Sequence, residues 1–324
     1  MKFNMIRLLY RLAPLMDLLL APLSLLSSSW SLYVRSAGFE RMPLARRIFL
    51  KIGVLPVRRH YYEPFFDPAD FRTALEKERE LPGIDMQETG QLALLDTLHY
   101  QDELLRFPIE NRYNGTFYYK NDFFAPGDAE FLYAMIRSHR PHRIIEVGSG
   151  NSTLMILNAL EANRIDNSQY KCALTCIEPY ESPWLEEQGV TVLRKCVEEV
   201  EPVLFSELES GDILFIDSSH VIKPQGDILY LYLHVLPMLK SGVLVHIHDI
   251  MTPRDYFHVW VVDKLQLWNE QYLLEAFLTL NRDFSVVASL NFLKHHHFDR
   301  LAAVCPILKQ IPASEPGSFW IRRL

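Results

Sequence analysis

The sequence of 324 residues contains little cysteine, no low-complexity segment and no obvious internal repeat. Its four cysteines do not form the pattern of a disulfide framework, since Cys172 and Cys176 lie about 13 Å apart on one predicted strand. A reducing compartment is therefore the simpler expectation. The length and the ordinary composition predict one large globular domain, or a domain with a long extension.

The N-terminal segment lacks an uninterrupted apolar run. Leu12 to Val34 is rich in leucine and about long enough to cross a bilayer, but Pro14, Asp17 and Pro22 interrupt it. Residues 1–60 carry a formal charge of +8, which leaves −15 on the rest of the chain. The favoured interpretation is a helical arm packed on its own domain or on a second subunit of a homo-oligomer. The alternative is an interfacial amphipathic helix, with peripheral contact through residues 1–35 at the inner membrane face.

The stretch from His142 to Thr153 predicts a strand, a glycine turn and a helix N-terminus. Such a turn lets backbone N–H groups approach an adenosine-bearing ligand, although any βα turn can carry two glycines. Dinucleotide-binding turns have a third glycine where this chain has Thr153. Glu146 ends the strand, and a carboxylate there suits a positively charged ligand without phosphate, which describes S-adenosylmethionine (SAM). The residues expected to bind it are Glu146, Gly148, Ser149, Gly150, Ser152, Thr153, Glu178 and Asp217.

Beyond this turn, strand and helix patterns alternate, which predicts an α/β fold with a mostly parallel sheet and helices on both faces. Helices are expected at 91–105, 129–138, 225–239 and 255–280. Polar residues follow the predicted strands at their carboxyl ends, where ligands bind in such sheets. The strands are expected at 143–147, 172–177, 190–193, 213–216, 242–247, 284–290 and 318–322.

Asp217, His220, His248 and Asp249 follow the fourth and fifth predicted strands and are the candidates for chemistry. An imidazole has an ordinary pKa near 6.5, so His220 is suited to remove a proton from a hydroxyl group at neutral pH, with Asp217 and His248 beside it. The carboxylates of Asp217 and Asp249 are a candidate site for Mg²⁺ or another divalent cation. The alternatives are a capping or supporting histidine at 220 and a turn-capping aspartate at 249.

Four stretches, RIIEVGSGNST, CIEPY, ILFIDSSH and GVLVHIHDI, resemble class I SAM-dependent methyltransferases, most of all the bacterial macrocin/mycinamicin-type sugar and small-molecule O-methyltransferases. The resemblance implies a Rossmann-like sheet of seven strands with an antiparallel last strand. It assigns Glu146, Gly148, Gly150 and Glu178 to SAM, Asp217 and Asp249 to magnesium, and His220 to the base. His248 stands where those enzymes have an acidic residue, so the metal here is either nitrogen-tolerant or absent.

We therefore expect a cytoplasmic SAM-dependent O-methyltransferase that acts on a hydroxyl group of a small molecule or sugar and binds no nucleic acid. Its expected parts are a basic apolar arm at 1–60, a helical and aromatic lead-in at 61–125, and the methyltransferase domain at 126–324. The aromatic stretch at 113–124 forms either a pocket wall or a satellite cluster. The alternatives are a non-catalytic SAM- or partner-binding module at a membrane surface, an NAD(P)-dependent oxidoreductase, and an iron site formed by Asp217, His246 and His248.

Overall fold

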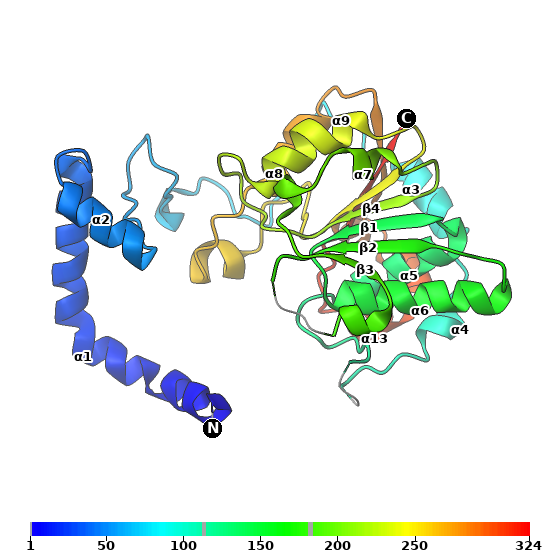
Figure 1. Cartoon of the computed structure of the whole chain (residues 1–324), viewed down its shortest axis with the longest axis horizontal. Coiled ribbons are helices and arrows are strands. Elements are labelled where there is room, and N and C mark those ends of the chain that lie inside the picture. Colours follow the sequence, from blue (N-terminus) through cyan, green and yellow to red (C-terminus); the bar gives the residue numbers. More distant parts are fainter. Residues whose placement is uncertain (1, 112–114, 181–183) are drawn as a thin grey trace. The chain divides into compact units, whose positions relative to one another are not determined.

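The computed structural model describes residues 2–111, 115–180 and 184–324, and side chains from Leu12 onward. The chain divides into two compact units, Met1–Arg72 and Thr73–Leu324, and each is described by itself (Figure 1). The predicted division at residues 60 and 125 stays a prediction. Tyr113 and Asn114, at the start of the predicted aromatic wall, lie outside the described residues.

Unit 1 is built on α1 (Lys2–Ala37), which continues as one helix through Pro14 and Pro22. It is followed by α2 (Pro43–Ile52), which starts with its proline and ends at Gly53, whose φ of +80° gives a left-handed C-cap. The short 3₁₀ turn η1 (Pro68–Asp70) comes next. Within the described residues, Leu12–Ala37 is the one helical stretch long and apolar enough to cross a membrane, by length and composition.

Unit 2 contains a twisted sheet with the strand order β3-β2-β1-β4-β5-β7-β6, in which β7 alone runs antiparallel to its neighbours among the described strands. The prediction of a Rossmann-like, mostly parallel sheet of seven strands is confirmed, with strand ends shifted by at most two residues. The strands are β1 (Arg143–Val147), β2 (Ala173–Ile177), β3 (Thr191–Leu193), β4 (Ile213–Ile216), β5 (Leu244–Ile247), β6 (Phe284–Ser289) and β7 (Phe319–Arg323).

The register of the sheet explains why the predicted polar residues meet. Val147 of β1 pairs with Ile177 of β2 and with Ile216 of β4, and Ile216 pairs in turn with Ile247 of β5. The four residues that follow these partners therefore leave the same edge of the sheet side by side. They are Glu178, Gly148, Asp217 and His248.

Helices cover both faces of the sheet, and alternate strand residues face each layer. Ile144 packs in one core with α5 and α6, whereas Ile145 packs in the other core with α8 and α10. The first layer holds α3 (Glu88–Leu95), α4 (Gln101–Leu104), α5 (Asp128–His139), α6 (Asn151–Asp166), α11 (Leu290–His296), α12 (Phe298–Val304) and α13 (Pro306–Gln310), and the second holds α7 (Val203–Ser206), α8 (Asp227–Tyr230), η4 (Leu231–Val235), α9 (Leu236–Met238) and α10 (Glu270–Leu278).

The expectation of one surface helix at 91–105 is wrong. The segment forms α3 and α4 with a turn between them, in which the Thr97 hydroxyl donates to the Leu94 carbonyl at 2.7 Å and so competes with the helical ladder. Gln91 is buried rather than exposed, because its amide oxygen accepts from the N–H of Ser289 at 2.8 Å. The segment is thus part of the packed domain.

The expectation of one long helix at 255–280 is also wrong. A π-helical turn, η5 (Val259–Asp263), is followed by irregular chain, and α10 begins only at Glu270. The break is held by tertiary contacts, since the N–H of Asn269 donates to the carbonyl of His220 and the Asn269 side chain accepts from the N–H of Ile222. These contacts bring the start of α10 to the edge where Asp217 emerges.

Candidate active site

Gly148 forms the tight part of the turn between β1 and α6. Its φ is +80°, and a Cβ atom added there would lie 1.8 Å from the backbone oxygen of Asp217. The Gly148 N–H donates to the carbonyl of Ile177 at 3.0 Å, which holds the turn against the end of β2. Only glycine fits this position. Gly150 differs, because a Cβ atom there would meet nothing within 4 Å.

Glu146 lies fully buried behind this turn and binds the turn's own side chains. Its carboxylate accepts hydrogen bonds from the hydroxyls of Ser152 at 2.7 Å, Thr153 at 2.6 Å and Ser149 at 3.1 Å. Burial raises the pKa of Glu146 to about 7, although these hydroxyls partly offset the effect. We call this set the Glu146 network; it orders the turn, while direct contact of Glu146 with a cofactor stays a prediction.

A cavity of about 250 Å³ lies beside the turn, between the ends of β1, β2 and β4. Half-buried Glu178 lines it, and its carboxylate accepts from the N–H groups of Ser149 at 3.0 Å and Tyr180 at 2.9 Å. Gly148 and Asp217 line the cavity as well, so three of the predicted cofactor residues share one space. Further charged lining residues, which sequence reasoning missed, are Glu198, Lys223 and Asp227.

His220 contacts Asp217, does not line this cavity and is almost fully buried. Its Nε2 atom lies 3.3 Å from a carboxylate oxygen of Asp217 and 3.5 Å from one of Asp249. Its Nδ1 atom lies 2.8 Å from the buried carboxylate of Glu270, at the start of α10. Glu270 is held in turn by the Tyr232 hydroxyl at 3.2 Å. His220 also has a φ of +57°, a costly conformation for a non-glycine residue that often marks a functional position.

An aromatic cluster covers His220 from the irregular chain before α10. The Trp268 ring centroid lies 4.6 Å from that of His220, and Trp260 and Tyr256 pack on Trp268 at 5.0 and 6.0 Å. The predicted aromatic wall at 113–124 contributes differently: Phe124 is buried and lies 5.1 Å from the His248 ring. Apolar side chains thus limit solvent access to both imidazoles.

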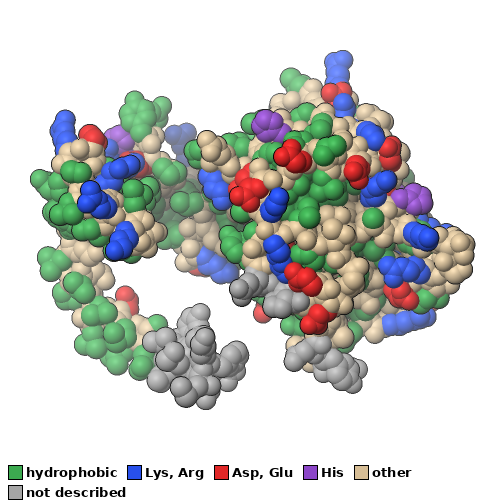
Figure 2. Space-filling view, in the orientation of Figure 1, with side chains coloured by type: hydrophobic (Ala, Val, Ile, Leu, Met, Phe, Trp, Pro, Cys, Tyr) green, Lys and Arg blue, Asp and Glu red, His purple; other side chains and the backbone are tan. Residues whose placement is uncertain are grey.

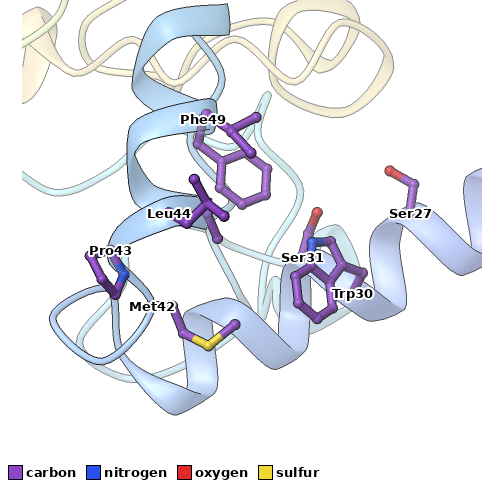
Figure 3. A pocket seen from close by; sticks show the side chains of 9 residues that line it. Ser27, Trp30, Ser31, Met42, Pro43, Leu44 and Phe49 are labelled. Atoms are coloured by element: carbon purple, nitrogen blue, oxygen red, sulfur yellow. The ribbon is translucent and has the colours of Figure 1, made fainter.

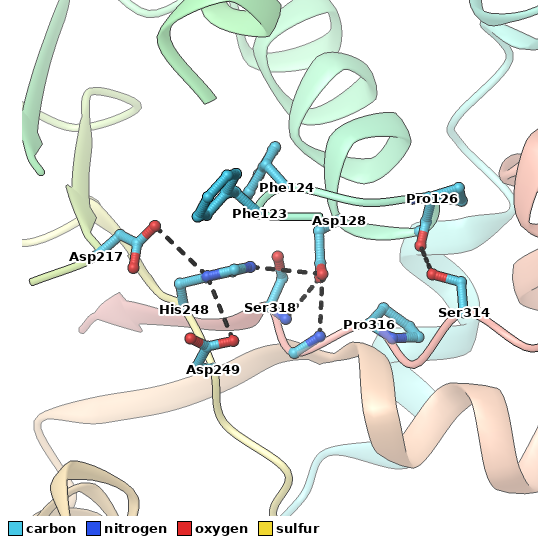
Figure 4. A network of polar contacts seen from close by, with 12 residues as sticks. Phe123, Phe124, Pro126, Asp128, Asp217, His248, Asp249, Ser314, Pro316 and Ser318 are labelled. Carbon is cyan, nitrogen blue, oxygen red and sulfur yellow. Dashed lines mark hydrogen bonds and ion pairs between the residues drawn. The ribbon is translucent and has the colours of Figure 1, made fainter. Parts of the chain in front are cut away.

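His248 lies at the end of β5 between three carboxylates (Figure 4). Its Nδ1 atom lies 3.5 Å from Asp217 and 3.6 Å from Asp249, and its Nε2 atom lies 3.5 Å from Asp128. These distances are long, and within residues 2–111, 115–180 and 184–324 neither ring nitrogen has a hydrogen-bond partner. Asp128 itself accepts from the N–H of Ser318 at 2.7 Å. We call His220, His248, Asp128, Asp217, Asp249 and Glu270 the histidine–carboxylate cluster.

The pKa values in the cluster follow from burial and from charge pairing. Burial lowers the pKa of His220, but Asp217 and Glu270 outweigh it and raise that pKa to about 10. Burial also opposes the charged form of His248, yet the charges of Asp249 and Asp217 hold its pKa well above the ordinary value. The same partners act on Asp217: burial raises its pKa, and the two imidazoles lower it below the usual range. The carboxylates around the two imidazoles therefore favour the protonated form of each.

Asp217, His248 and Asp249 each direct a donor atom to a common point, since these atoms all lie within 4.8 Å of one another. This set contains the two predicted metal ligands and His248. His246, which the iron alternative requires, is occupied otherwise: its Nε2 atom lies 2.8 Å from the Ser318 hydroxyl and its ring stacks on Phe215.

Sequence reasoning missed two members of the cluster, Glu270 and Asp128. Glu270 lies inside a segment with the pattern of a continuous helix, and nothing local shows that this helix breaks next to it. Asp128 stands after Gly127 at a predicted helix start, where an acidic residue is ordinary. For Glu270 the signal that could have found it is the neighbouring Asn269, whose backbone and side chain bond to residues 220 and 222 where the helix breaks.

Comparisons with known proteins bear on the domain that carries most of these residues. Residues 145–250 match a family described as a methyltransferase domain. An uncharacterised protein of Archaeoglobus fulgidus is 32% identical over 178 residues, which cover 50% of this chain and 78% of the archaeal protein. The chain belongs to the same family as this archaeal protein, and it carries a methyltransferase domain.

Two solved structures are also similar. The O-methyltransferase TomG from Streptomyces achromogenes, involved in tomaymycin synthesis and solved with SAM, is 12% identical with a TM-score of 0.36, over 74% of this chain and 91% of that one. An O-methyltransferase from Bacillus cereus, solved with S-adenosylhomocysteine (SAH), is 11% identical with a TM-score of 0.36, over 72% and 90% of the two chains.

Proposed function

We propose that this methyltransferase-domain protein transfers the methyl group of SAM to a hydroxyl group of a small molecule or sugar, in the cytoplasm. The observation that carries the proposal is the position of Asp217, which lines the cavity beside Gly148 and also contacts the imidazole of His220. A cofactor on one side of Asp217 and a proton acceptor on the other are what methyl transfer to a hydroxyl requires.

The proposed cofactor site uses the residues that line the cavity. The Glu178 carboxylate accepts hydrogen bonds from the two ribose hydroxyls, in place of the N–H groups that it now binds. Gly148 leaves room for the cofactor to approach the backbone. Ser149, Gly150, Ser152 and Thr153 shape this turn and the helix start behind it, and the Glu146 network keeps them in place.

His220 is the proposed base and Glu270 the residue that positions it. With a proton on Nδ1 directed at Glu270, a neutral imidazole presents Nε2 as the acceptor. Bound SAM would supply the methyl group from its sulfonium and would leave as the neutral thioether SAH. Nε2 of His220 would take the proton that the acceptor hydroxyl loses. Because the surrounding carboxylates raise the pKa of His220 to about 10, the proposal requires part of their charge to be neutralised elsewhere.

The residues Asp217, His248 and Asp249 fit a divalent cation. They supply two carboxylates and one imidazole to a common point, and His248 has both ring nitrogens without a hydrogen bond within the described chain. A bound cation there supplies positive charge, which lowers the pKa of a nearby hydroxyl and of a neighbouring imidazole. One nitrogen among the donors suits manganese, iron, cobalt or zinc at least as well as magnesium.

The test is a titration of the purified full chain with SAH, followed by transfer of a labelled methyl group from SAM to a panel of phenols, sugars and polyols. We expect micromolar binding and label in at least one hydroxyl compound. Turnover should fall with EDTA and return with an added divalent cation; unchanged turnover would exclude the metal. Binding of NAD(P)H instead of SAH would contradict the whole proposal. SAH binding without transfer, together with normal cellular function of an Asp217→Ala/His220→Ala variant, would leave a non-catalytic module.

A further inference from the structure

We propose that α1 spans a lipid bilayer and that α2 lies in the anionic headgroup region at the cytoplasmic end of α1. The inference rests on unit 1 alone and is independent of methyl transfer. It differs from the interfacial helix among the sequence-based interpretations, because leucines cover most of the circumference of α1 and its narrow polar stripe is mainly serine.

Exposed leucines of α1 cover about two thirds of the circumference of the helix. Leu18, Leu19 and Leu20 are consecutive, about 100° apart on the helix, and are 74%, 63% and 43% exposed. Leu25 and Leu26 lie about two turns further along and are 70% and 69% exposed. The remaining stripe carries Asp17 and the serines 24, 28 and 31. A helix that lies flat at an interface needs a strongly charged face, whereas this stripe holds one charged side chain between Leu12 and Arg35, so a bilayer span fits α1 better.

The length and the ends of α1 also match a bilayer. Leu12–Ala37 contains 26 residues, or about 39 Å of helix, which exceeds the roughly 30 Å of a hydrocarbon core and allows some tilt. Trp30 and Tyr33 stack near its C-terminal end with ring centroids 5.9 Å apart, as aromatic residues at a membrane interface do. Prolines such as Pro14 and Pro22 are tolerated in spanning helices.

The charges around α1 indicate which end faces the cytoplasm. Three basic residues precede Leu12, whereas six follow Ala37 before residue 60. By the positive-inside rule, the C-terminal end of α1 lies in the cytoplasm. In α2, Leu44, Ile48 and Ile52 share one face and are exposed, while Arg47 and Lys51 lie on another. Basic side chains gather over α2 and hydrophobic ones over α1 (Figure 2), a pattern complementary to acyl chains beneath anionic headgroups.

An apolar cavity of about 450 Å³ lies between α1 and α2 (Figure 3). Trp30, Met42, Leu44, Ile48 and Phe49 supply most of its lining, with two serines at one side. Exposure of this apolar surface to water is unfavourable. We assign an acyl chain of a bilayer lipid as its occupant, because that chain also surrounds the leucines of α1.

The experiment follows the full chain in vesicles of phosphatidylcholine with phosphatidylglycerol, extracted first with salt and then with alkaline carbonate. We expect the chain to resist both, and external trypsin to cleave after Arg46 and Arg47 only where the cytoplasmic face is outside. In a Leu19→Glu/Leu23→Glu variant, the fraction of protein that stays with the vesicles after carbonate extraction should be at least tenfold smaller than in the wild type. Leu233→Glu is the matched control, since Leu233 is a helical leucine of unit 2 with 61% exposure, like Leu23.

SAH binding of each variant reports whether unit 2 remains folded, so failure of the membrane proposal is distinguishable from failure of the proposed function. Release by salt or carbonate would overturn the span and restore the interfacial helix. If the chain instead forms a concentration-dependent dimer and does not bind vesicles, the exposed leucines of α1 pack against a second copy of the chain, and the membrane proposal is overturned. A chain from cells whose mass lacks the first helix would identify α1 as a cleaved leader, which also overturns the proposal.

Discussion

The Glu146 network and the histidine–carboxylate cluster lie next to each other, yet they are built in opposite ways. In the Glu146 network a single buried carboxylate is surrounded by hydroxyl donors at 2.6–3.1 Å. In the cluster, four carboxylates face two imidazoles, and apart from the His220–Glu270 contact the imidazole–carboxylate distances are 3.3–3.6 Å. In the Glu146 network the carboxylate has its hydrogen bonds satisfied, and the network fixes the backbone of the turn. In the cluster, the ring nitrogens of His248 are left without hydrogen bonds within the described part of the chain, which suits proton exchange or cation binding.

The largest expected effect comes from breaking the turn itself. Gly148→Ala places a methyl group 1.8 Å from the Asp217 carbonyl at a φ of +80°, so the turn cannot keep its shape. We expect a loss of stability above about 4 kcal/mol, or SAH binding weakened more than about 100-fold, measured by thermal unfolding and calorimetric titration. Gly150→Ala is the matched control and should bind SAH nearly as the wild type does, because its Cβ meets nothing within 4 Å. Equal behaviour of the two variants would refute the assignment of the turn.

The second effect breaks the cluster and leaves the turn intact. His220→Ala should lower kcat by about 10²–10⁴ with little change in SAH affinity, because it removes the base and no part of the cofactor cavity. Glu270→Gln should lower kcat by roughly ten to a hundredfold without raising the KM for SAM, since the amide still holds the ring but without charge. Exposed His234→Ala is the control. Wild-type turnover in His220→Ala would remove His220 from the chemistry.

The smallest expected effect is a pH dependence of stability that comes from the buried carboxylate of the Glu146 network. Burial raises the pKa of Glu146 from 4.5 to about 7, so the folded state binds this proton more tightly than the unfolded state does. The contribution of Glu146 to stability is therefore present below about pH 4.5 and is lost as the pH rises to 7. We expect the unfolding free energies of wild type and Glu146→Gln to diverge by roughly 2–3 kcal/mol across this window, in urea melts. Parallel pH profiles for the two proteins would show that Glu146 is not buried as described.

The strands and the turn were accessible from the sequence because their signals are local. Short apolar runs ended by polar residues located all seven strands, and the parallel order that alternation implies brings the residues after those strands to one edge. The helices at 91–105 and 255–280 were wrong for different reasons. At 91–105 the Thr97 hydroxyl bonds the nearby Leu94 carbonyl and competes with the helical ladder, whereas at 255–280 hydrogen bonds of Asn269 to His220 and Ile222 replace that ladder. Apolar periodicity contains no information about either kind of partner.

The sequence by itself therefore determined the α/β sheet and the turn at Gly148, where only glycine fits. It also determined that Asp217, His220, His248 and Asp249 follow the ends of strands. These follow from short-range sterics and from the direction of parallel strands. The hydroxyls that surround Glu146 lie three to seven residues along the chain and reach it through the shape of the turn. The tertiary structure alone decided that Glu270 pairs with His220 from 50 residues away and that Asp128 faces His248. Those two pairings depend on how separate helices pack on the sheet, and the contacts with the opposite charge offset the free-energy cost of burying each group.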